Sequence, residues 1–224
     1  MAATGWRSAH DRQGSWPGGM IAAVLAGGAG RRFGGGEKGL ALFRGKPMIT
    51  RALKAVNGTV QSTVIIANRP ELYSTFGLSV YPDVIRGMGP LSGLHAAFHH
   101  TGASGILLLA CDMPLVSAEM VKFLAGRAED APGDAVIPIA NGKEQGLFAV
   151  YRRRALDKHL ARIAAASIQF DEFRRAIEKT LIGEDELRKV EPGLASFINV
   201  NSKADLALLE KGESAEPPGK ERLK

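Results

Sequence analysis

The chain has 224 residues, 45% of them hydrophobic and 23% charged, which is the composition of one globular domain. Its single cysteine, Cys111, excludes an internal disulfide and favours a reduced, cytoplasmic setting. The net charge of +6 (29 Lys and Arg against 23 Asp and Glu) includes no long basic run, and the best apolar run, 105–111, is too short to span a bilayer, so neither nucleic acid nor a membrane is expected as a partner.

Taken in chain order, residues 1–19 show no hydrophobic periodicity, and we expect a disordered or mis-assigned N-terminal extension there. Apolar runs of strand length then alternate with segments of helical period. They predict a strand over 21–26, a helix over 47–56, strands over 63–67 and 78–81, a helix over 91–100, a strand over 105–110, a helix over 117–127, strands over 135–139 and 147–151, helices over 153–164 and 170–179, a strand over 196–200 and a helix over 202–210. The polar residues 211–224 are expected to form a flexible tail, which leaves one domain over 20–210.

This alternation predicts an α/β fold with a largely parallel sheet that is covered by helices on both faces. Two of the predicted helices also have a typical N-terminal residue, because Ser117 is a plausible N-cap and Pro47 a plausible first helical residue. Ligands bind such sheets beyond the carboxyl ends of the strands, so the residues that follow each strand are the candidates for chemistry.

The first predicted strand runs into a glycine-rich loop over 25–39, which holds seven glycines beside Arg31, Arg32 and Lys38. Glycines let backbone N–H groups approach phosphate oxygens, and the cations supply countercharge, so a triphosphate is the expected ligand of this loop. The dinucleotide-binding pattern fails at Phe33, and the P-loop pattern fails because no Ser or Thr follows the lysine. A flexible turn with solvated charges is the alternative interpretation.

The pattern Leu25-Ala-Gly-Gly-x-x-x-Arg-x-Gly-Gly with Glu37-Lys-Gly-Leu40 resembles the opening signature of molybdenum cofactor guanylyltransferases, within the nucleotidyltransferases of Rossmann-like fold. Other family motifs follow in the same order: Gly45-Lys-Pro47, Ala67-Asn-Arg69, Pro82-Asp83, Gly89-Pro-Leu-Ser-Gly93, Cys111-Asp-Met-Pro114 and Asn199-Val-Asn-Ser202. Three positions depart from the family pattern: Glu37 replaces the usual Asp, Gln145-Gly146 stands where relatives often have a proline, and Ile66 stands where a polar GTP contact can occur.

The resemblance implies a three-layer fold with a mostly parallel mixed sheet, and transfer of GMP from GTP to molybdopterin with Mg²⁺ and release of pyrophosphate. It also implies transient contact with other cofactor-biosynthesis proteins or apo-molybdoenzymes. Lys38 and Arg32 would stabilise the phosphates and Asp112 would hold the metal. The implied GTP contacts are Leu25, Ala26, Gly27, Gly28, Lys38, Asp83 and Asp112.

Two aspartates can also be interpreted from their positions alone. Asp112 closes a buried apolar run, where a carboxylate can hold Mg²⁺; capping of the next helix is the alternative, although Ser117 is better placed for it. Asp83 follows the strand predicted over 78–81 and is equally compatible with an Asx turn.

Two asparagines follow the last predicted strand, and alternation places Asn199 and Asn201 on one face. Their amide oxygens could complete a magnesium shell or orient substrate. The alternative is a helix N-cap at Asn201 or Ser202.

Other reactive residues are given structural interpretations. His95, His99 and His100 lack an evident third metal ligand and are expected to be structural histidines, and Cys111 is expected to pack rather than to react. The basic run 152–154 would be a solvated surface or, less favoured, a contact to the anionic pterin.

Alternative functions stay open at this stage. One is the same chemistry with another nucleotide or acceptor, as in a molybdopterin cytidylyltransferase or a sugar-phosphate nucleotidyltransferase. The Gly-Gly of Leu25-Ala-Gly-Gly28 favours guanine, because the cytidylyl relatives usually carry Ala-Gly there. A nucleotide-binding protein without catalysis is less favoured, since Lys38 and Asp112 are both present.

Overall fold

The computed structural model describes residues 19–27 and 36–212 of the chain. Residues 1–18, the tail from 213 onwards and the loop residues Gly28, Arg31 and Arg32 lie outside this part, and so do the expectations that concern them. Within the described part, no helix is long and apolar enough to cross a membrane.

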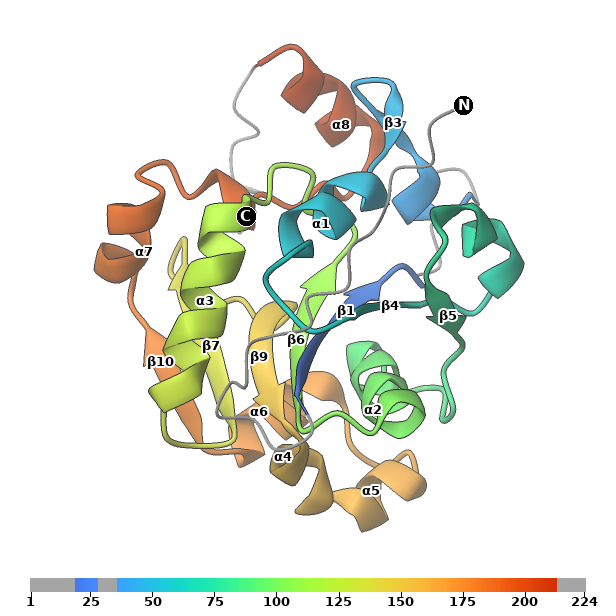
Figure 1. Ribbon diagram of the computed structural model, residues 1–224, viewed down its shortest axis with the longest axis vertical. Coiled ribbons are helices and arrows are strands. Elements are labelled where there is room, and N and C mark those ends of the chain that lie inside the picture. The colour runs from blue at the N-terminus through green and yellow to red at the C-terminus, as the bar shows by residue number, and fades with distance from the viewer. Residues whose placement is uncertain (1–18, 28–35, 213–224) are drawn as a thin grey trace, which may run out of the picture.

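The described residues build one central sheet of eight strands in the order β10-β7-β9-β6-β1-β4-β5, with β8 paired to β7 (Figure 1). β1 is parallel to both its neighbours, with Leu25 level with Ile66 of β4 and Ala110 of β6. β9 is antiparallel to β6 and β7, so the sheet is mixed and mostly parallel, as expected. The strands are β1 (Met20–Leu25), β4 (Thr63–Ile66), β5 (Ser79–Tyr81), β6 (Gly105–Ala110), β7 (Ala135–Ala140), β8 (Lys143–Glu144), β9 (Phe148–Arg152) and β10 (Lys179–Ile182).

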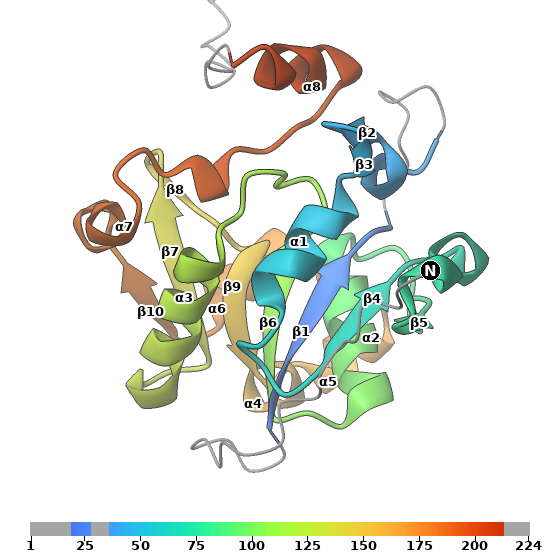
Figure 2. The ribbon, with the colours of Figure 1, turned by 45° about the horizontal axis from the view of Figure 1, so that its top comes forward.

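Helices cover both faces of this sheet and give the expected three layers (Figures 1 and 2). Alternation along the apolar strands sends Val24 and Leu109 to one face and Ala23 and Leu108 to the other. The first face carries α1 (Ile49–Val56), α3 (Ala118–Asp130) and α7 (Glu184–Val190). The second face carries α2 (Pro90–Thr101), α4 (Arg153–Asp157), α5 (Leu160–Ala164) and α6 (Phe170–Ala176). The 3-10 turns are η2 (Lys38–Leu40), η3 (Pro70–Phe76) and η4 (Ala195–Phe197).

A small satellite core lies above the sheet, where α8 (Lys203–Glu210) packs near the hairpin of β2 (Leu42–Phe43) and β3 (Lys46–Pro47) (Figure 2). Ser202 begins α8 with a capping box, since its hydroxyl accepts the Asp205 N–H while the Asp205 carboxylate accepts the Ser202 N–H. The cap of α8 is therefore Ser202, which leaves the Asn201 side chain available for other contacts.

Several sequence predictions are wrong in their boundaries or type. The strand predicted over 196–200 is absent, because Leu194 has a left-handed backbone and the chain then makes the turn η4 instead of joining the sheet. The helix predicted over 170–179 ends at Ala176, and the chain continues into the edge strand β10. This strand was not predicted because its sequence is half polar. The single helix predicted over 153–164 is interrupted at His159.

The helix start signals divide into one success and one error. Ser117 caps α3 as predicted, because its hydroxyl accepts the Met120 N–H at 3.2 Å. Pro47 belongs instead to β3, and α1 begins two residues later at Ile49.

Candidate active site

A cavity of about 560 Å³ opens beyond the carboxyl ends of β1, β4, β5 and β6. Its wall contains six of the residues singled out by sequence, which come from four separate chain segments: Leu25, Ala26, Gly27, Lys38, Asp83 and Asp112. Gly28 and Arg32 lie outside the described residues, and Asn199 and Asn201 line a second cavity. The sheet edge therefore assembles these positions as the rule for parallel sheets requires.

The ion pair between Lys38 and Asp112 is the chemical centre of this cavity. Lys38 Nζ donates to Asp112 Oδ2 at 2.6 Å and to Asn201 Oδ1 at 3.3 Å. The other carboxylate oxygen, Asp112 Oδ1, is buried and has no hydrogen-bond partner within the described structure. A buried, unsatisfied anionic oxygen is costly unless a ligand fills the role of partner, so this atom marks the place where a cation or donor belongs.

A hydrogen-bond cluster around the buried Tyr73 holds Glu37, the residue before Lys38. Tyr73 Oη lies 3.1 Å from both the Ala26 carbonyl and Glu37 Oε2, and Arg69 pairs with the Glu37 carboxylate at 2.7 Å. Glu37 immediately precedes Lys38, and Ala26 precedes the undescribed loop residues. Tyr73 thus joins two positions near the two ends of the glycine-rich loop, Ala26 and Glu37, a contact that the sequence did not predict because η3 was not expected.

A second pair of side chains lies at the mouth of the same cavity. Asn68 Nδ2 donates to Asp83 Oδ2 at 2.8 Å, and the Asp83 N–H donates back to Asn68 Oδ1 at 3.2 Å. This reciprocal pairing links the residues that follow β4 and β5. Arg86 also lines the cavity, and no sequence motif indicated it.

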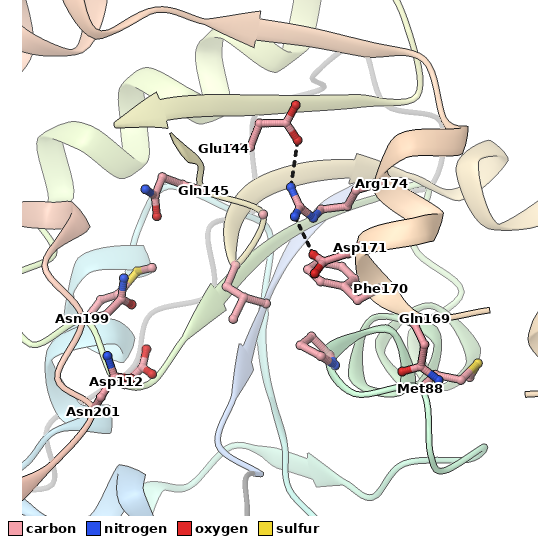
Figure 3. Close-up of a pocket in the computed structure, with 14 residues that line it drawn as sticks. Met88, Asp112, Glu144, Gln145, Gln169, Phe170, Asp171, Arg174, Asn199 and Asn201 are labelled. Carbon is pink, nitrogen blue, oxygen red and sulfur yellow. Dashed lines mark hydrogen bonds and ion pairs between the residues drawn. The ribbon is translucent and has the colours of Figure 1, made fainter. Parts of the chain in front are cut away.

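A second cavity of about 500 Å³ adjoins the first and shares Asp112, Pro90 and Leu147 with it. Asn199 and Asn201 line this second cavity on the side of Asp112 (Figure 3). The two asparagines reach it because the Val200 N–H donates to the Asp112 carbonyl at 2.9 Å, which ties residues 199–201 to the end of β6.

The other reactive residues have structural surroundings. Cys111 is buried, and burial next to Asp112 raises the pKa of its thiol to about 12, so it stays protonated and packs as expected. Burial and its neighbours His99 and His100 lower the pKa of His95. No group of three metal-ligating His, Cys, Asp or Glu side chains exists among the described residues.

The basic run 152–154 lies at the opposite edge of the sheet, and the solvated surface expected from the sequence describes only Arg154, whose side chain is 54% exposed. The guanidinium of Arg152 donates to the Ala128 and Ala131 carbonyls at the end of α3, both at 2.8 Å. Arg153 donates to the Phe98 and Ala103 carbonyls at and beyond the end of α2. Arg152 and Arg153 thus donate to carbonyls at the ends of α3 and α2, which is a structural role.

A mostly parallel sheet with two adjoining cavities at the carboxyl ends of its strands is the arrangement expected of a nucleotidyltransferase. Residues 22–181 match the model of the MobA-like NTP transferase domain, and the chain belongs to this family. It is 33% identical over 197 residues to the molybdenum cofactor guanylyltransferase of Desulfosudis oleivorans, covering 88% of this chain and 96% of that protein. It is 34% identical to a probable molybdenum cofactor guanylyltransferase of Bacillus licheniformis, covering 85% and 96%.

A solved structure is similar to most of the chain. The molybdopterin-guanine dinucleotide biosynthesis protein A of Archaeoglobus fulgidus superimposes with a TM-score of 0.74 and 30% identity, covering 86% of this chain and 97% of that one. The fold class and the enzyme class expected from the sequence are thereby confirmed.

Proposed function

We propose that the chain transfers GMP from GTP to the terminal phosphate of molybdopterin, or of its molybdenum-loaded form, and releases pyrophosphate. One observation carries the proposal: two cavities of similar size meet at Asp112, and each can take one substrate. The names of the relatives support the choice of these two substrates. Substrates held in adjoining cavities react as if in one molecule, which removes much of the entropic barrier.

In this proposal the first cavity holds GTP. The backbone at Leu25, Ala26 and Gly27 would contact the nucleotide, with Gly28 and Arg32 continuing the phosphate site. Asp83, oriented by Asn68, would accept a hydrogen bond from the nucleoside. Lys38 would move from Asp112 toward the phosphates as they arrive, since both groups line the same cavity.

The described residues also fit a magnesium ion. Asp112 Oδ1 is buried without a partner, and the amide-bearing Asn199 and Asn201 line the adjoining cavity, which together offer the hard oxygen ligands that Mg²⁺ prefers. Neutralisation of phosphate charge is the chemistry that the ion supplies when bound. Asp112, with the asparagines as further ligands, is the group that would hold it.

The transfer needs little acid or base. An oxygen of the acceptor's phosphate forms a bond to the α-phosphorus of GTP, and the bond from that phosphorus to the β-phosphate oxygen breaks, with the electron pair leaving on pyrophosphate. The attacking phosphate is already anionic, so no strong base is required. Lys38 and Arg32 stabilise the charge that moves to the leaving group.

We place the reaction in the cytoplasm, within one domain over residues 20–210, with transient contact to the proteins that supply or receive the cofactor. The single buried cysteine supports the compartment. A pull-down with apo-molybdoenzymes at physiological salt tests these contacts.

An NTP panel tests the proposed reaction. Each of GTP, CTP, ATP and UTP is incubated with Mg²⁺ and either molybdopterin or a sugar phosphate, and pyrophosphate release is followed together with the mass of the product. We expect release with GTP and a guanine dinucleotide product. Preference for CTP would replace the guanylyl assignment with a cytidylyl one, turnover with sugar phosphates but not molybdopterin would replace the acceptor, and binding of GTP without release in any combination would indicate a non-catalytic protein.

A further inference from the structure

The far end of the second cavity, away from Asp112, carries a charged cluster that the proposed chemistry does not use. Arg174 of α6 donates from Nη1 to Glu144 at 2.8 Å and from Nη2 to Asp171 Oδ1 at 2.6 Å (Figure 3). Lys179 at the start of β10 also pairs with Glu144, at 2.7 Å. We call these four residues the far-end cluster.

A missing side chain makes room for Arg174. A Cβ atom on Gly146 would lie 2.6 Å from Arg174 Cδ and 2.9 Å from its Nε, closer than real Cβ contacts allow. The arginine stem therefore crosses the backbone at Gly146, and its guanidinium lies 5.4 Å from the ring centre of Phe170. Gly146 belongs to the Gln145-Gly146 departure from the family pattern, and its place under Arg174 gives that departure a physical reason.

Arg174 holds the carboxylates of Glu144 and Asp171 in place and is poorly suited to bind an anionic ligand. Its side chain is only 17% exposed, and both terminal nitrogens are already engaged by Glu144 and Asp171. The cluster as a whole has two positive and two negative groups, so it offers no excess charge to a phosphate.

Asp171 is the most exposed member of the far-end cluster and lines the second cavity. Its side chain is 69% exposed, and Oδ2 has no hydrogen bond within the described structure, whereas Oδ1 is held by Arg174. The hydrogen bond from Arg174 lowers the pKa of Asp171, so the carboxylate is a pure acceptor at neutral pH. An oriented, ionised acceptor in a cavity selects a ligand edge that carries N–H donors.

The direction of the cavity then assigns the two ends of the acceptor. Asp112 and the asparagines lie at one end of the cavity, and Glu144, Arg174 and Asp171 of the far-end cluster lie at the other (Figure 3). An acceptor with its phosphate beside Asp112 places its ring system toward Asp171. The 2-amino-4-oxopyrimidine edge of a pterin presents adjacent N–H donors, which match a carboxylate.

We infer that Asp171, held by Arg174 across Gly146, is a specificity-determining residue that accepts hydrogen bonds from the aminopyrimidinone edge of the acceptor. The inference rests on the proposed function and adds to it the group that recognises the ring. Glu144 and Lys179 are positioning residues, since they act through Arg174.

Two fluorescent probes test the inference by binding alone. The probes are 6-hydroxymethylpterin phosphate and the matching 6-hydroxymethyllumazine phosphate, which carries a carbonyl where the pterin has its amino group. We expect the wild-type protein to bind the pterin about tenfold or more tightly than the lumazine, the loss typical of a hydrogen bond to a charged group. Asp171→Asn should reduce this preference to about twofold or less while GTP affinity stays unchanged.

Matched variants separate recognition from damage to the fold. Glu172→Gln removes a charge from the next residue of α6, whose partner is Arg162, and should keep the full preference. Gly146→Ala should displace Arg174 and weaken the pterin preference, whereas Gly126→Ala, which meets open space, should not.

The outcomes that overturn the inference differ from those that overturn the proposed function. A pterin preference that persists in Asp171→Asn, or that Glu172→Gln reduces equally, overturns the inference and leaves the reaction intact. Failure of the wild-type protein to bind either probe, with GTP still bound, overturns the proposed acceptor and the inference with it.

Discussion

Two carboxylates at opposite edges of the same sheet, Asp112 and Asp134, are both paired with cations but differ in how completely they are satisfied. Asp134, just before β7, accepts from Arg154 and Lys158 at Oδ1 and from Lys158 and the Glu178 N–H at Oδ2. Asp112 has one oxygen paired with Lys38 and one buried oxygen with no partner in the described structure. A fully bonded carboxylate stabilises a fold, whereas a half-bonded one beside a cavity is available to a ligand.

The largest effect should come from Asp112→Ala. Removal of the carboxylate that faces both cavities should lower kcat/KM for pyrophosphate release by about 10²- to 10³-fold, while the melting temperature changes little. Asp157→Asn, an exposed carboxylate on the opposite edge, is the matched control. Retained Mg²⁺-dependent turnover in Asp112→Ala would remove Asp112 from the site.

Lys38→Met should lower kcat/KM by about 10²-fold, because it removes a cation from the phosphates and leaves Asp112 without its partner. Lys38→Arg keeps the positive charge, so it should retain more activity than Lys38→Met if the charge of Lys38 stabilises the phosphates. Steady-state kinetics with GTP varied at saturating acceptor measures both variants. Equal activity of the Met and Arg variants would contradict a role in charge stabilisation.

Asp134→Asn should have the opposite effect to Asp112→Ala. Activity should be kept, and the free energy of unfolding should fall by about 1–3 kcal/mol. Burial raises the pKa of Asp134, but hydrogen bonds from Lys158 and the Glu178 N–H outweigh it and hold the pKa below the ordinary value of 3.8. The contribution is therefore present above that pH and disappears as pH falls through the folded-state pKa. Urea unfolding of both proteins between pH 7 and pH 3 measures it, and a constant difference over this range would contradict the assignment.

The smallest effect is expected for Tyr73→Phe, which removes a buried hydroxyl that contacts the Ala26 carbonyl and Glu37. Loss of about one hydrogen bond should raise the KM for GTP roughly three- to tenfold and leave the acceptor KM unchanged. Tyr81→Phe removes a hydroxyl with no hydrogen bond in the described structure and serves as the control. A change confined to thermal stability would show that Tyr73 supports the fold without orienting the loop.

The sequence by itself determined the α/β class, the buried strands β1, β4 and β6, and the residues at their carboxyl ends. These features are local, because an apolar run and the polar residue that closes it are adjacent in the chain. Asp112 was predicted in this way, whereas Leu25 to Gly27, Lys38 and Asp83 were assigned to the site through the family resemblance, and the structure brings all of them to one cavity. The cap at Ser117 was predictable for the same reason.

The tertiary structure alone decided the second cavity and the pairing of the charged side chains at its far end. Arg174 was predicted inside a helix, and nothing local indicated that it meets Glu144, 30 residues away, across the space left by Gly146. Edge strand β10 and helix α7 were missed because half-exposed segments carry a weak hydrophobic period. Burial and pairing are properties of neighbours in space, so the fully bonded Asp134 and the half-bonded Asp112 cannot be told apart until the chain is folded.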